Sequence, residues 1–471
     1  MKNKIIQILI LFFIIILSSY FFINSSIGSD QFTNIKKIIP EKYKIFLKEN
    51  IFFKKYQKEL NLTIIEKKEE IKNIKKNILI NKEIYLNRNK KVEQFEVFQS
   101  KISLEKYNTF QLQTSKHPGS IGNSYLDFFG DYLFMVSADG IISVINKYKF
   151  FKSSDILKAD IIETNLNKLI KHELFFENSQ FGIKDILISN SKLYITFTNE
   201  YKKNCFNTAI LSAEINFKKL IFSEFFVPNE CISINNESLE FNAHQSGGRL
   251  VNFTNEKFIF SIGEYRDRKR AQDLKTIFGK IISIDIKTKN YEIISLGHRN
   301  VQGLYYDIDT NSILSSEHGP KGGDEININL LNETKIKNFG WPISSYGEHY
   351  KNNEEIYKKF PLYKSHSDYG FEEPLVYFSP SIGISQILIL PKKYIDSKFR
   401  SIIYGSLGKD PKEGDMSLYF ANLKENKIIN NLTFNLNERV RDIIYDNETN
   451  TIFLFLESTS SIGILRNIDN K

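Results

Sequence analysis

The run YLFMVSADG at residues 132–140 joins five large apolar residues to a turn of small and polar ones. Similar runs recur along the chain, as KLYITF (192–197), KFIFS (257–261), KIISI (280–284) and TIFLF (451–455). Short segments rich in β-branched and aromatic residues and bounded by Asn, Asp and Gly are typical of β-strands. The pattern therefore predicts an all-β domain.

The length of this β-rich region narrows the architecture. It extends over residues 96–471, which is too long for one β-sandwich. About six propeller blades of four strands each would account for it. We therefore predict a six-bladed β-propeller over residues 96–471.

The N-terminus has the composition of a membrane segment. Lys2 and Lys4 precede an apolar run from Ile5 to Ile23, and about 20 apolar residues suffice for a helix to span a bilayer. No clean small-residue cleavage site follows the run. Residues 1–29 are therefore interpreted as a transmembrane signal anchor in the inner membrane, with the main domain on its periplasmic, extracytoplasmic face. Cleavage would instead secrete the domain.

Residues 30–95 alternate Lys/Glu clusters with Ile, Leu and Phe, and they contain no Gly and a single Pro, Pro40. This pattern favours helix. We predict a helical stalk that holds the main domain off the membrane. The alternative is a solvated helix without a specific partner.

The net charge of +9 is concentrated near the N-terminus. Residues 1–95 hold 19 Lys and Arg against 9 Asp and Glu, which leaves 45 against 46 in the rest of the chain. A nearly neutral main domain gives no support to a nucleic-acid partner.

Cys205 and Cys231 are the only cysteines. In an exported chain, two cysteines that flank a strand pair favour one disulfide. Two unpaired buried thiols remain the alternative.

Two polar segments indicate a proton acceptor and an anion site. In NAHQSGGRL (242–250), His244 is a candidate general base, and Glu264, one strand away, could fix its tautomer. A purely structural histidine is the alternative. In GHRNVQGL (297–304), Arg299 beside Asn300 suits a planar anion with several oxygens, or else Arg299 caps loop carbonyls.

Two further segments carry clustered charges. SEHGPKGGDEIN (316–327), followed by NFGWP (338–342), sets carboxylates among Gly and Pro, which is typical of a hard-cation site or of a plain turn. In NERVRD (437–442), the alternation of a strand puts Arg439 and Arg441 on one face. Such a pair favours an anionic partner, unless it lies on a solvated edge strand.

Together and in this order, these segments resemble the pyrroloquinoline quinone (PQQ)-dependent glucose/sorbosone dehydrogenase family, and its soluble bacterial aldose sugar dehydrogenases in particular. The resemblance covers about residues 105–467 and is most specific from Leu296 to Pro342. It implies an oxidoreductase that uses PQQ and Ca²⁺ to oxidise an aldose sugar or related alcohol. The hydride would pass to PQQ while a histidine acts as general base.

The resemblance also implies residue roles. His244 matches the general base, Glu264 stands where an Asp orients that base, and Arg299 acts at the quinone oxygens. The residues implied in cofactor binding are Gln180, His244, Arg299, Asn300, His318, Asp324, Tyr350, Ser406, Lys409, Arg439 and Arg441. The implied calcium ligands are the carbonyls of Gly319 and Pro320, and Glu325 with the carbonyl of Phe339 at a second site.

One loop departs from the family pattern. The family has a basic residue directly after a Ser/Ala-Leu pair, whereas this chain reads SLGKDP (406–411), so Lys409 would act from a shifted position. The rival to an enzyme is a non-catalytic propeller that binds sugars or a protein at the same site. A calcium-dependent lactonase-type hydrolase would leave the arginine pair without a role. The sequence does not specify the electron acceptor.

Overall fold

The computed structural model describes residues 62–63, 66, 69, 83–109, 122–152, 154–236, 240–333, 335–350, 354–395, 397–408, 415–425 and 427–469. The chain divides between Asn77 and Ile78, and nearly all of these residues lie in the larger part. The membrane segment predicted over residues 1–29 lies outside the described ranges. Within those ranges, no helix has the length and apolar character needed to cross a membrane.

The helix predicted over residues 30–95 is wrong for its C-terminal part. Leu62, Thr63, Glu66 and Glu69 are helical. Strand β1 (Glu83–Arg88), however, pairs with β3 (Ser100–Asn108) and β7 (Ile156–Thr164), and strand β2 (Glu93–Val97) pairs with β3. In β1, Ile84 and Leu86 are fully buried on either side of an exposed Tyr85, which is the period of a strand. The β-domain therefore begins at Glu83 and not at residue 96.

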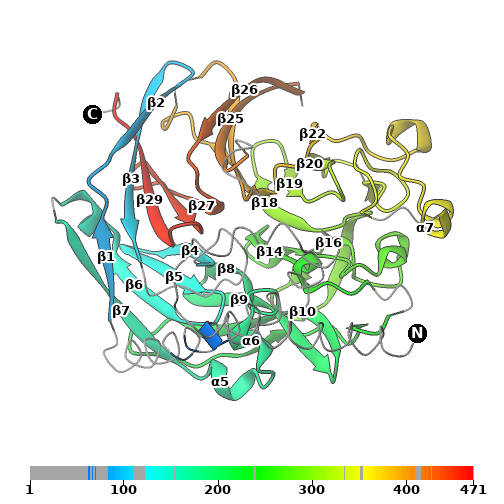
Figure 1. Cartoon of the computed structure of the whole chain (residues 1–471), viewed down its shortest axis with the longest axis horizontal. Coiled ribbons are helices and arrows are strands. Elements are labelled where there is room, and N and C mark those ends of the chain that lie inside the picture. The colour runs from blue at the N-terminus through cyan, green and yellow to red at the C-terminus, as the bar shows by residue number, and fades with distance from the viewer. Residues whose placement is uncertain are drawn as a thin grey trace, which may run out of the picture. The chain divides into compact units, whose positions relative to one another are not determined.

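Antiparallel strands meander outward from a common centre in residues 78–471 (Figure 1). All five segments quoted above as strands lie in β-strands, which confirms the all-β prediction. The first three meanders consist of β4 (Ser124–Phe129), β5 (Tyr132–Ser137), β6 (Ile142–Asn146) and β7; β8 (Ile183–Ser189), β9 (Lys192–Lys202), β10 (Cys205–Glu214) and β12 (Ser223–Phe226); and β14 (Gly247–Asn252), β15 (Lys257–Ile262), β16 (Lys280–Asp285) and β17 (Tyr291–Leu296).

The later meanders follow the same plan. They consist of β18 (Val301–Asp307), β19 (Ser312–Glu317), β20 (Asp324–Leu330) and β22 (Val376–Phe378); β23 (Ile384–Leu390), β24 (Arg400–Ser406), β25 (Ser417–Lys424) and β26 (Lys427–Asn435); and β27 (Val440–Asp446), β28 (Thr451–Leu456), β29 (Ser461–Asn467) and β3. The short strands β11 (Lys219–Leu220), β13 (Ile232–Ser233) and β21 (Lys337–Asn338) extend sheet edges. The described helices are short, namely α5 (Leu166–Leu169), α6 (Leu174–Glu177), α7 (Glu354–Lys359) and the 3₁₀ turns η2 (Lys147–Phe151), η3 (Ala243–Gln245), η4 (Arg268–Gln272) and η5 (Ser367–Tyr369).

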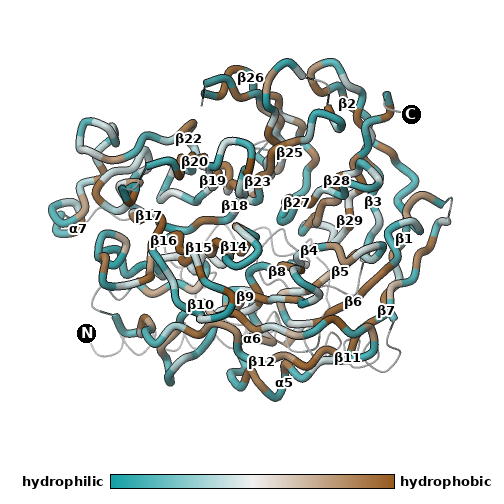
Figure 2. Tube along the Cα trace, turned by 180° about the vertical axis from the view of Figure 1, so that it is seen from behind, coloured by the Kyte–Doolittle hydropathy of each residue, from teal (hydrophilic) through white to brown (hydrophobic). Residues whose placement is uncertain are grey.

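The first strands of the meanders form a closed ring. Each contacts the next in the order β4, β8, β14, β18, β23, β27 and back to β4. The ring is completed by pairing of β29, near the C-terminus, with β3, which joins the two ends of the domain in one sheet. Apolar residues follow the strands, as along β6 and β9 in Figure 2, and pack between neighbouring sheets. This arrangement is a β-propeller.

A buried arginine joins the inner strands at the centre. Arg249 of β14 is 2% exposed, and its Nη1 donates to Asp185 Oδ1 at 3.0 Å and to Asp442 Oδ1 at 2.8 Å. Its Nε donates to the carbonyl of Gln302 and its Nη2 to that of Arg441. One guanidinium thereby connects β8, β14, β18 and β27, using its donors in a fixed planar fork.

We predict that Arg249→Met destabilises the fold strongly. Methionine keeps an unbranched side chain but leaves Asp185 and Asp442 buried without their cation, which costs about 3–5 kcal/mol. Urea denaturation would measure the change. Lys257→Met, which removes an exposed pair with Glu292, is the control and should cost less than about 1 kcal/mol. Equal losses in the two variants would contradict a special role for Arg249.

Cys205 and Cys231 form a disulfide, as expected from the sequence. The bond connects the start of β10 to the segment before β13, across a separation of 26 residues. Closing a loop of this length stabilises a protein by roughly 3 kcal/mol. We therefore expect the double substitution C205S/C231S to lower the free energy of unfolding by about this amount in urea titrations. A reductant should lower it equally in the wild type and leave the variant unchanged.

Candidate active site

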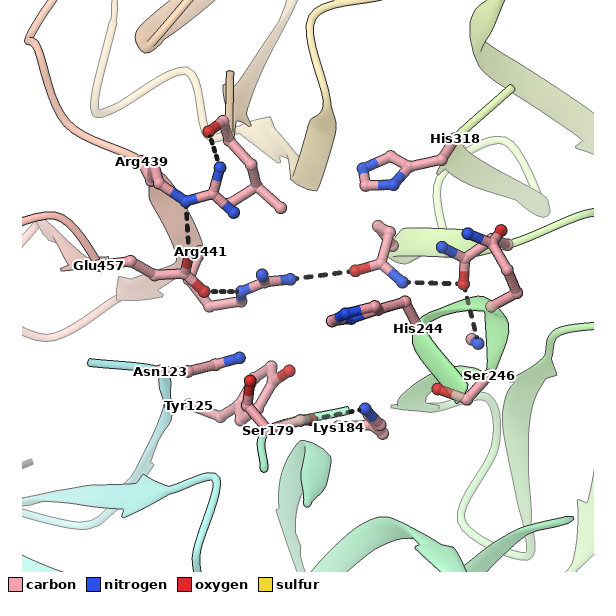
Figure 3. A pocket seen from close by; sticks show the side chains of 15 residues that line it. Asn123, Tyr125, Ser179, Lys184, His244, Ser246, His318, Arg439, Arg441 and Glu457 are labelled. Carbon is pink, nitrogen blue, oxygen red and sulfur yellow. Dashed lines mark hydrogen bonds and ion pairs between the residues drawn. The ribbon is translucent and has the colours of Figure 1, made fainter. Parts of the chain in front are cut away.

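A cavity of about 240 Å³ lies where the inner strands and their preceding loops converge (Figure 3). Its walls come from segments far apart in the chain. The lining residues are Asn123, Tyr125, Ser179, Lys184, His244, Gln245, Ser246, Gly247, Asn300, Gln302, His318, Leu407, Arg439, Arg441 and Glu457.

β-Bulges shape this end of the inner strands. The pairing register shifts between Ile183 and Asp185 in β8, between Val301 and Gly303 in β18, and between Val440 and Asp442 in β27. A bulge inserts one residue that is free of the regular alternation and redirects its side chain. The inserted residues are Lys184, Gln302 and Arg441, and all three line the cavity.

Arg439 and Arg441 converge on Glu457, as Figure 3 shows. Arg439 Nε donates to Glu457 Oε2 at 2.9 Å, and Arg441 Nε donates to Oε1 at 2.5 Å. Burial raises the pKa of Glu457, but the two guanidinium groups outweigh it and hold this pKa below its usual range. The carboxylate therefore fixes both arginines at the cavity wall. Because one carboxylate faces two guanidinium groups, positive charge is left over for an anionic ligand.

A chain of amides continues from Arg441 across the cavity wall. Arg441 Nη1 donates to Gln302 Oε1 at 3.0 Å, and Gln302 Nε2 donates to Asn300 Oδ1 at 3.1 Å. The same Asn300 oxygen accepts from the backbone N–H of Gly247 at 3.0 Å. With its oxygen held in this way, Asn300 keeps its amide nitrogen as a donor for a ligand in the cavity.

His244 projects into the cavity from the turn η3 (Figure 3). Asn242 begins this turn, and its side chain accepts from the backbone N–H of His244 at 2.8 Å. Gly248 follows with φ +112°, and a Cβ there would lie 2.3 Å from the Cβ of Lys184. Only glycine fits this close approach of β14 to β8. His244 is exposed, and it is one of the residues that line the cavity.

Glu264 lies behind this wall and does not line the cavity. It is fully buried, and burial raises its pKa to about 7, although Arg299 and Arg268 oppose the shift. Neither carboxylate oxygen has a side-chain hydrogen-bond partner among the described residues. Glu264 therefore makes no described side-chain hydrogen bond to His244, and the role of Glu264 in orienting that base stays a prediction.

The guanidinium of Arg299 is buried and makes its described hydrogen bonds to backbone carbonyls. Its Nη1 donates to the carbonyls of His318 and Gly319, and its guanidinium lies 5.3 Å from the centre of the Trp341 ring. These contacts match the alternative in which Arg299 caps loop carbonyls. It lines a small cavity of about 10 Å³ next to the main one.

That small cavity brings together part of the predicted calcium set. Gly319, Glu325 and Phe339 line it with Glu317, and its volume is about that of one water molecule or ion. Pro320 is not among its lining residues, and its carbonyl accepts from Ser381 Oγ at 3.4 Å. Within the described ranges, no three His, Cys, Asp or Glu residues are grouped so as to hold a metal ion.

Of two further predicted cofactor ligands, His318 lines the main cavity and Asp324 does not. His318 lines it, and burial lowers the pKa of its imidazole, which favours the neutral form. Asp324 is buried and accepts from the backbone N–H groups of Gly319, Gly383 and Ile384 at 2.7–3.0 Å. Its carboxylate positions these loops.

The remaining predicted ligands lie elsewhere. The side chain of Gln180 is not part of the lining, although its carbonyl accepts from Lys184. Ser406 Oγ bonds within the sheet, to the carbonyl of Ser417. Tyr350 is 53% exposed and lines a separate cavity of about 250 Å³. Lys409 lies outside the described residues.

Sequence reasoning missed several lining residues. Lys184 is a polar interruption of the apolar strand IKDILIS, and Glu457 follows directly after TIFLFL. A charged residue in or next to a buried strand is a signal for an internal partner. Neither signal says which way the side chain points, because that depends on the bulge in the strand.

Comparison with known proteins gives partial matches in sequence. The chain is 30% identical over 221 residues to "Uncharacterized protein slr1608" of Synechocystis sp., which covers 42% of this chain and 50% of that protein. It is 36% identical over 153 residues to "Aldose sugar dehydrogenase YliI" of Escherichia coli, which covers 30% of this chain and 38% of that protein. The chain thus spans half or less of the length of these curated relatives.

Solved structures match over more of the chain. The soluble aldose sugar dehydrogenase of Escherichia coli in its apo form has a TM-score of 0.58 at 20% identity, covering 77% of this chain and 99% of that one. The PQQ-bound aldose sugar dehydrogenase of Streptomyces coelicolor has a TM-score of 0.51 at 18% identity, covering 80% and 99%. At these identities the likeness shows the fold alone.

The family assignment comes from a family model that matches most of the β-domain. Residues 156–466 match the family model described as "Glucose / Sorbosone dehydrogenase". This range is well over half of the chain and contains most of the cavity-lining residues. The chain therefore belongs to the glucose/sorbosone dehydrogenase family.

Proposed function

We propose that this protein is a PQQ-dependent dehydrogenase that oxidises an aldose sugar or related alcohol. We further propose that its propeller has six blades, with the active site at the end of the inner strands. The observation that carries the proposal is the convergence of His244, Arg439 and Arg441 on one cavity. A proton acceptor and an anion-binding pair are the two elements that this reaction requires of the protein.

The residues present fit a planar polycarboxylate such as PQQ. Among the described lining residues, Lys184, Arg439 and Arg441 are cationic, and Glu457 is the only carboxylate. Guanidinium groups held in a fixed orientation bind carboxylates with two parallel hydrogen bonds. Asn300 adds a neutral donor. These side chains line the cavity and would hold the cofactor there.

PQQ, when bound, supplies an electrophilic quinone that accepts the hydride of the alcohol. His244 contributes the proton acceptor, since the substrate hydroxyl must lose its proton as the carbonyl forms. The turn η3 holds the imidazole at the cavity, and its exposure lets a substrate hydroxyl reach it. Arg439 and Arg441, held by Glu457, stabilise negative charge on the ligand without having to reorganise.

Calcium is proposed at two places, and the protein atoms support them unequally. Glu325 and Phe339 already meet at the small cavity, and Glu317 adds a second carboxylate there. The carbonyl of Gly319 instead accepts from Arg299, and the Asp324 carboxylate accepts three backbone N–H groups. A cation at Gly319 would have to displace a guanidinium, and one at Glu325 would have to compete with His366, whose Nε2 lies 3.4 Å from Glu325 Oε1. Glu325, unlike Asp324, lines the small cavity, and this supports a cation there.

We also propose that the domain works outside the cytoplasm, held at the inner membrane by residues 1–29. The disulfide supports this location, because such bonds persist in oxidising compartments. A non-catalytic propeller remains the second reading, but binding alone does not account for an exposed histidine facing two fixed arginines.

We expect the protein to reduce an artificial electron-accepting dye after reconstitution with PQQ and Ca²⁺. The assay compares a panel of aldoses and simple alcohols, with protein lacking PQQ as the control. Because His244 must reach a hydroxyl group, turnover should require an alcohol substrate. PQQ binding without turnover on any alcohol would favour the non-catalytic reading, and absence of PQQ binding would rule out both the cofactor and the activity.

His244→Ala should retain PQQ and lose turnover. Removal of a general base lowers kcat by about 10²- to 10⁴-fold, whereas the arginine pair that binds the cofactor stays in place. Stopped-flow reduction by sugar and PQQ titration would measure the two properties separately. A variant that keeps the wild-type rate would show that another group accepts the proton.

A further inference from the structure

Lys184 places a third cation in the cavity. It is the inserted residue of the bulge in β8, between Ile183 and Asp185, so its side chain leaves the strand toward the cavity. Its Nζ donates to the carbonyls of Ser179 at 2.9 Å and Gln180 at 2.7 Å. An ammonium has three hydrogens, and the described contacts use two of them. Carbonyls solvate the charge but do not neutralise it.

The surroundings hold Lys184 at this position. Gly248 packs so closely that a Cβ there would lie 2.3 Å from Lys184 Cβ, which fixes the start of the side chain. The next residue, Asp185, faces the other way and pairs with Arg249 at 3.0 Å. Asp185 therefore forms its ion pair with Arg249 and not with Lys184. The bulge separates the two side chains, so that the acid lies beneath the cavity and the lysine lines it.

The charges around the cavity do not balance at Lys184. Glu457, the one carboxylate among the described lining residues, is shared by Arg439 and Arg441. Figure 3 shows Lys184 on a different wall from this triad. An anion between the two walls would contact cations on both sides. A planar molecule with carboxylates at separate positions has the shape to do so.

We propose that Lys184 is a direct ligand for a carboxylate of the bound PQQ, and that it makes cofactor binding depend on pH. The inference rests on the proposed function, because it requires that PQQ occupy this cavity. It adds a binding residue outside the motifs described above, on a different wall from the arginine pair.

The protonation state of Lys184 determines whether PQQ affinity rises or falls with pH. Burial, and then the nearby Arg441, lower the pKa of Lys184 to about 7 in the cavity without ligand. A bound carboxylate favours the charged form and raises this pKa again. Below pH 7 the ammonium is already charged, so binding needs no proton. Above pH 7 binding must take up a proton, and affinity therefore falls as the pH rises.

Other titratable or charged groups also face Lys184 or the cavity. They are Tyr125, His244, His318, Arg439, Arg441 and Glu457 around the cavity, and Asp185 with Arg249 beneath it. Burial raises the pKa of Tyr125 to about 12, and the pKa values of His318 and Glu457 lie below their usual ranges. These three groups therefore do not change charge between pH 7 and pH 9. A variant at position 184 separates the lysine from the rest.

The experiment titrates PQQ into the full-length wild type, Lys184→Met and Lys192→Met from pH 6 to 9, and follows the cofactor absorbance. Lys192 lies in the neighbouring strand β9, pairs with the exposed Glu214 and serves as the control. We expect K184M to weaken binding about tenfold or more below pH 7, as loss of a charge-assisted hydrogen bond does. The ratio of the two dissociation constants should shrink above pH 7. K192M should match the wild type throughout.

Calorimetry in two buffers of different ionisation enthalpy gives the proton count directly. At pH 8 the wild type should take up protons on binding PQQ, and K184M should take up fewer. If K184M fails to fold, the wild-type count decides, and zero uptake overturns the proposal. Wild type and K184M with equal affinities at every pH would also overturn it, with the proposed function intact. A wild type that does not bind PQQ would overturn both.

Discussion

The buried guanidinium of Arg249 is the contact on which the centre of this propeller depends. The inner strands form a closed ring around the axis, where backbone and side-chain polar groups are removed from water. Arg249 pairs with Asp185 and Asp442 and also binds the carbonyls of Gln302 and Arg441. One planar donor set thereby fixes the relative positions of four strands from different sheets. The cavity lies against this fixed centre.

The same strands bulge beside Arg249, and the bulges divide the charged side chains into two levels. Asp185 and Asp442 turn toward Arg249, while the adjacent Lys184 and Arg441 turn into the cavity. Asp185 and Asp442 are paired with Arg249 in the interior, whereas the side chains of Lys184 and Arg441 can contact a ligand in the cavity. The positive charge of the cavity lining thus depends on the β-bulges in these strands. The disulfide between Cys205, at the start of β10, and Cys231 adds stability but takes no part in this division.

Sequence patterns predicted much of the fold and part of the site. The runs at 133–136 and 451–455 are strands because their apolar, β-branched and aromatic residues are buried between sheets. Residues 83–88 were predicted as helix, because the surrounding Lys and Glu obscured the alternation of Ile84, Tyr85 and Leu86. His244, Asn300, His318, Arg439 and Arg441 do meet at one cavity. Tyr350 lies at another, and Arg299 faces inward.

The sequence by itself determined the all-β class and the family and favoured one disulfide, because strand periodicity, ordered motifs and the cysteine count can be read from the chain without its fold. Only the tertiary structure decided the direction of each polar side chain. Alternation along a strand assigns Lys184 and Asp185 to opposite faces, but which of them lines the cavity depends on the bulge in β8 and on Arg249 from another sheet. That choice depends on hydrogen bonds between residues 64 positions apart, which no local pattern records.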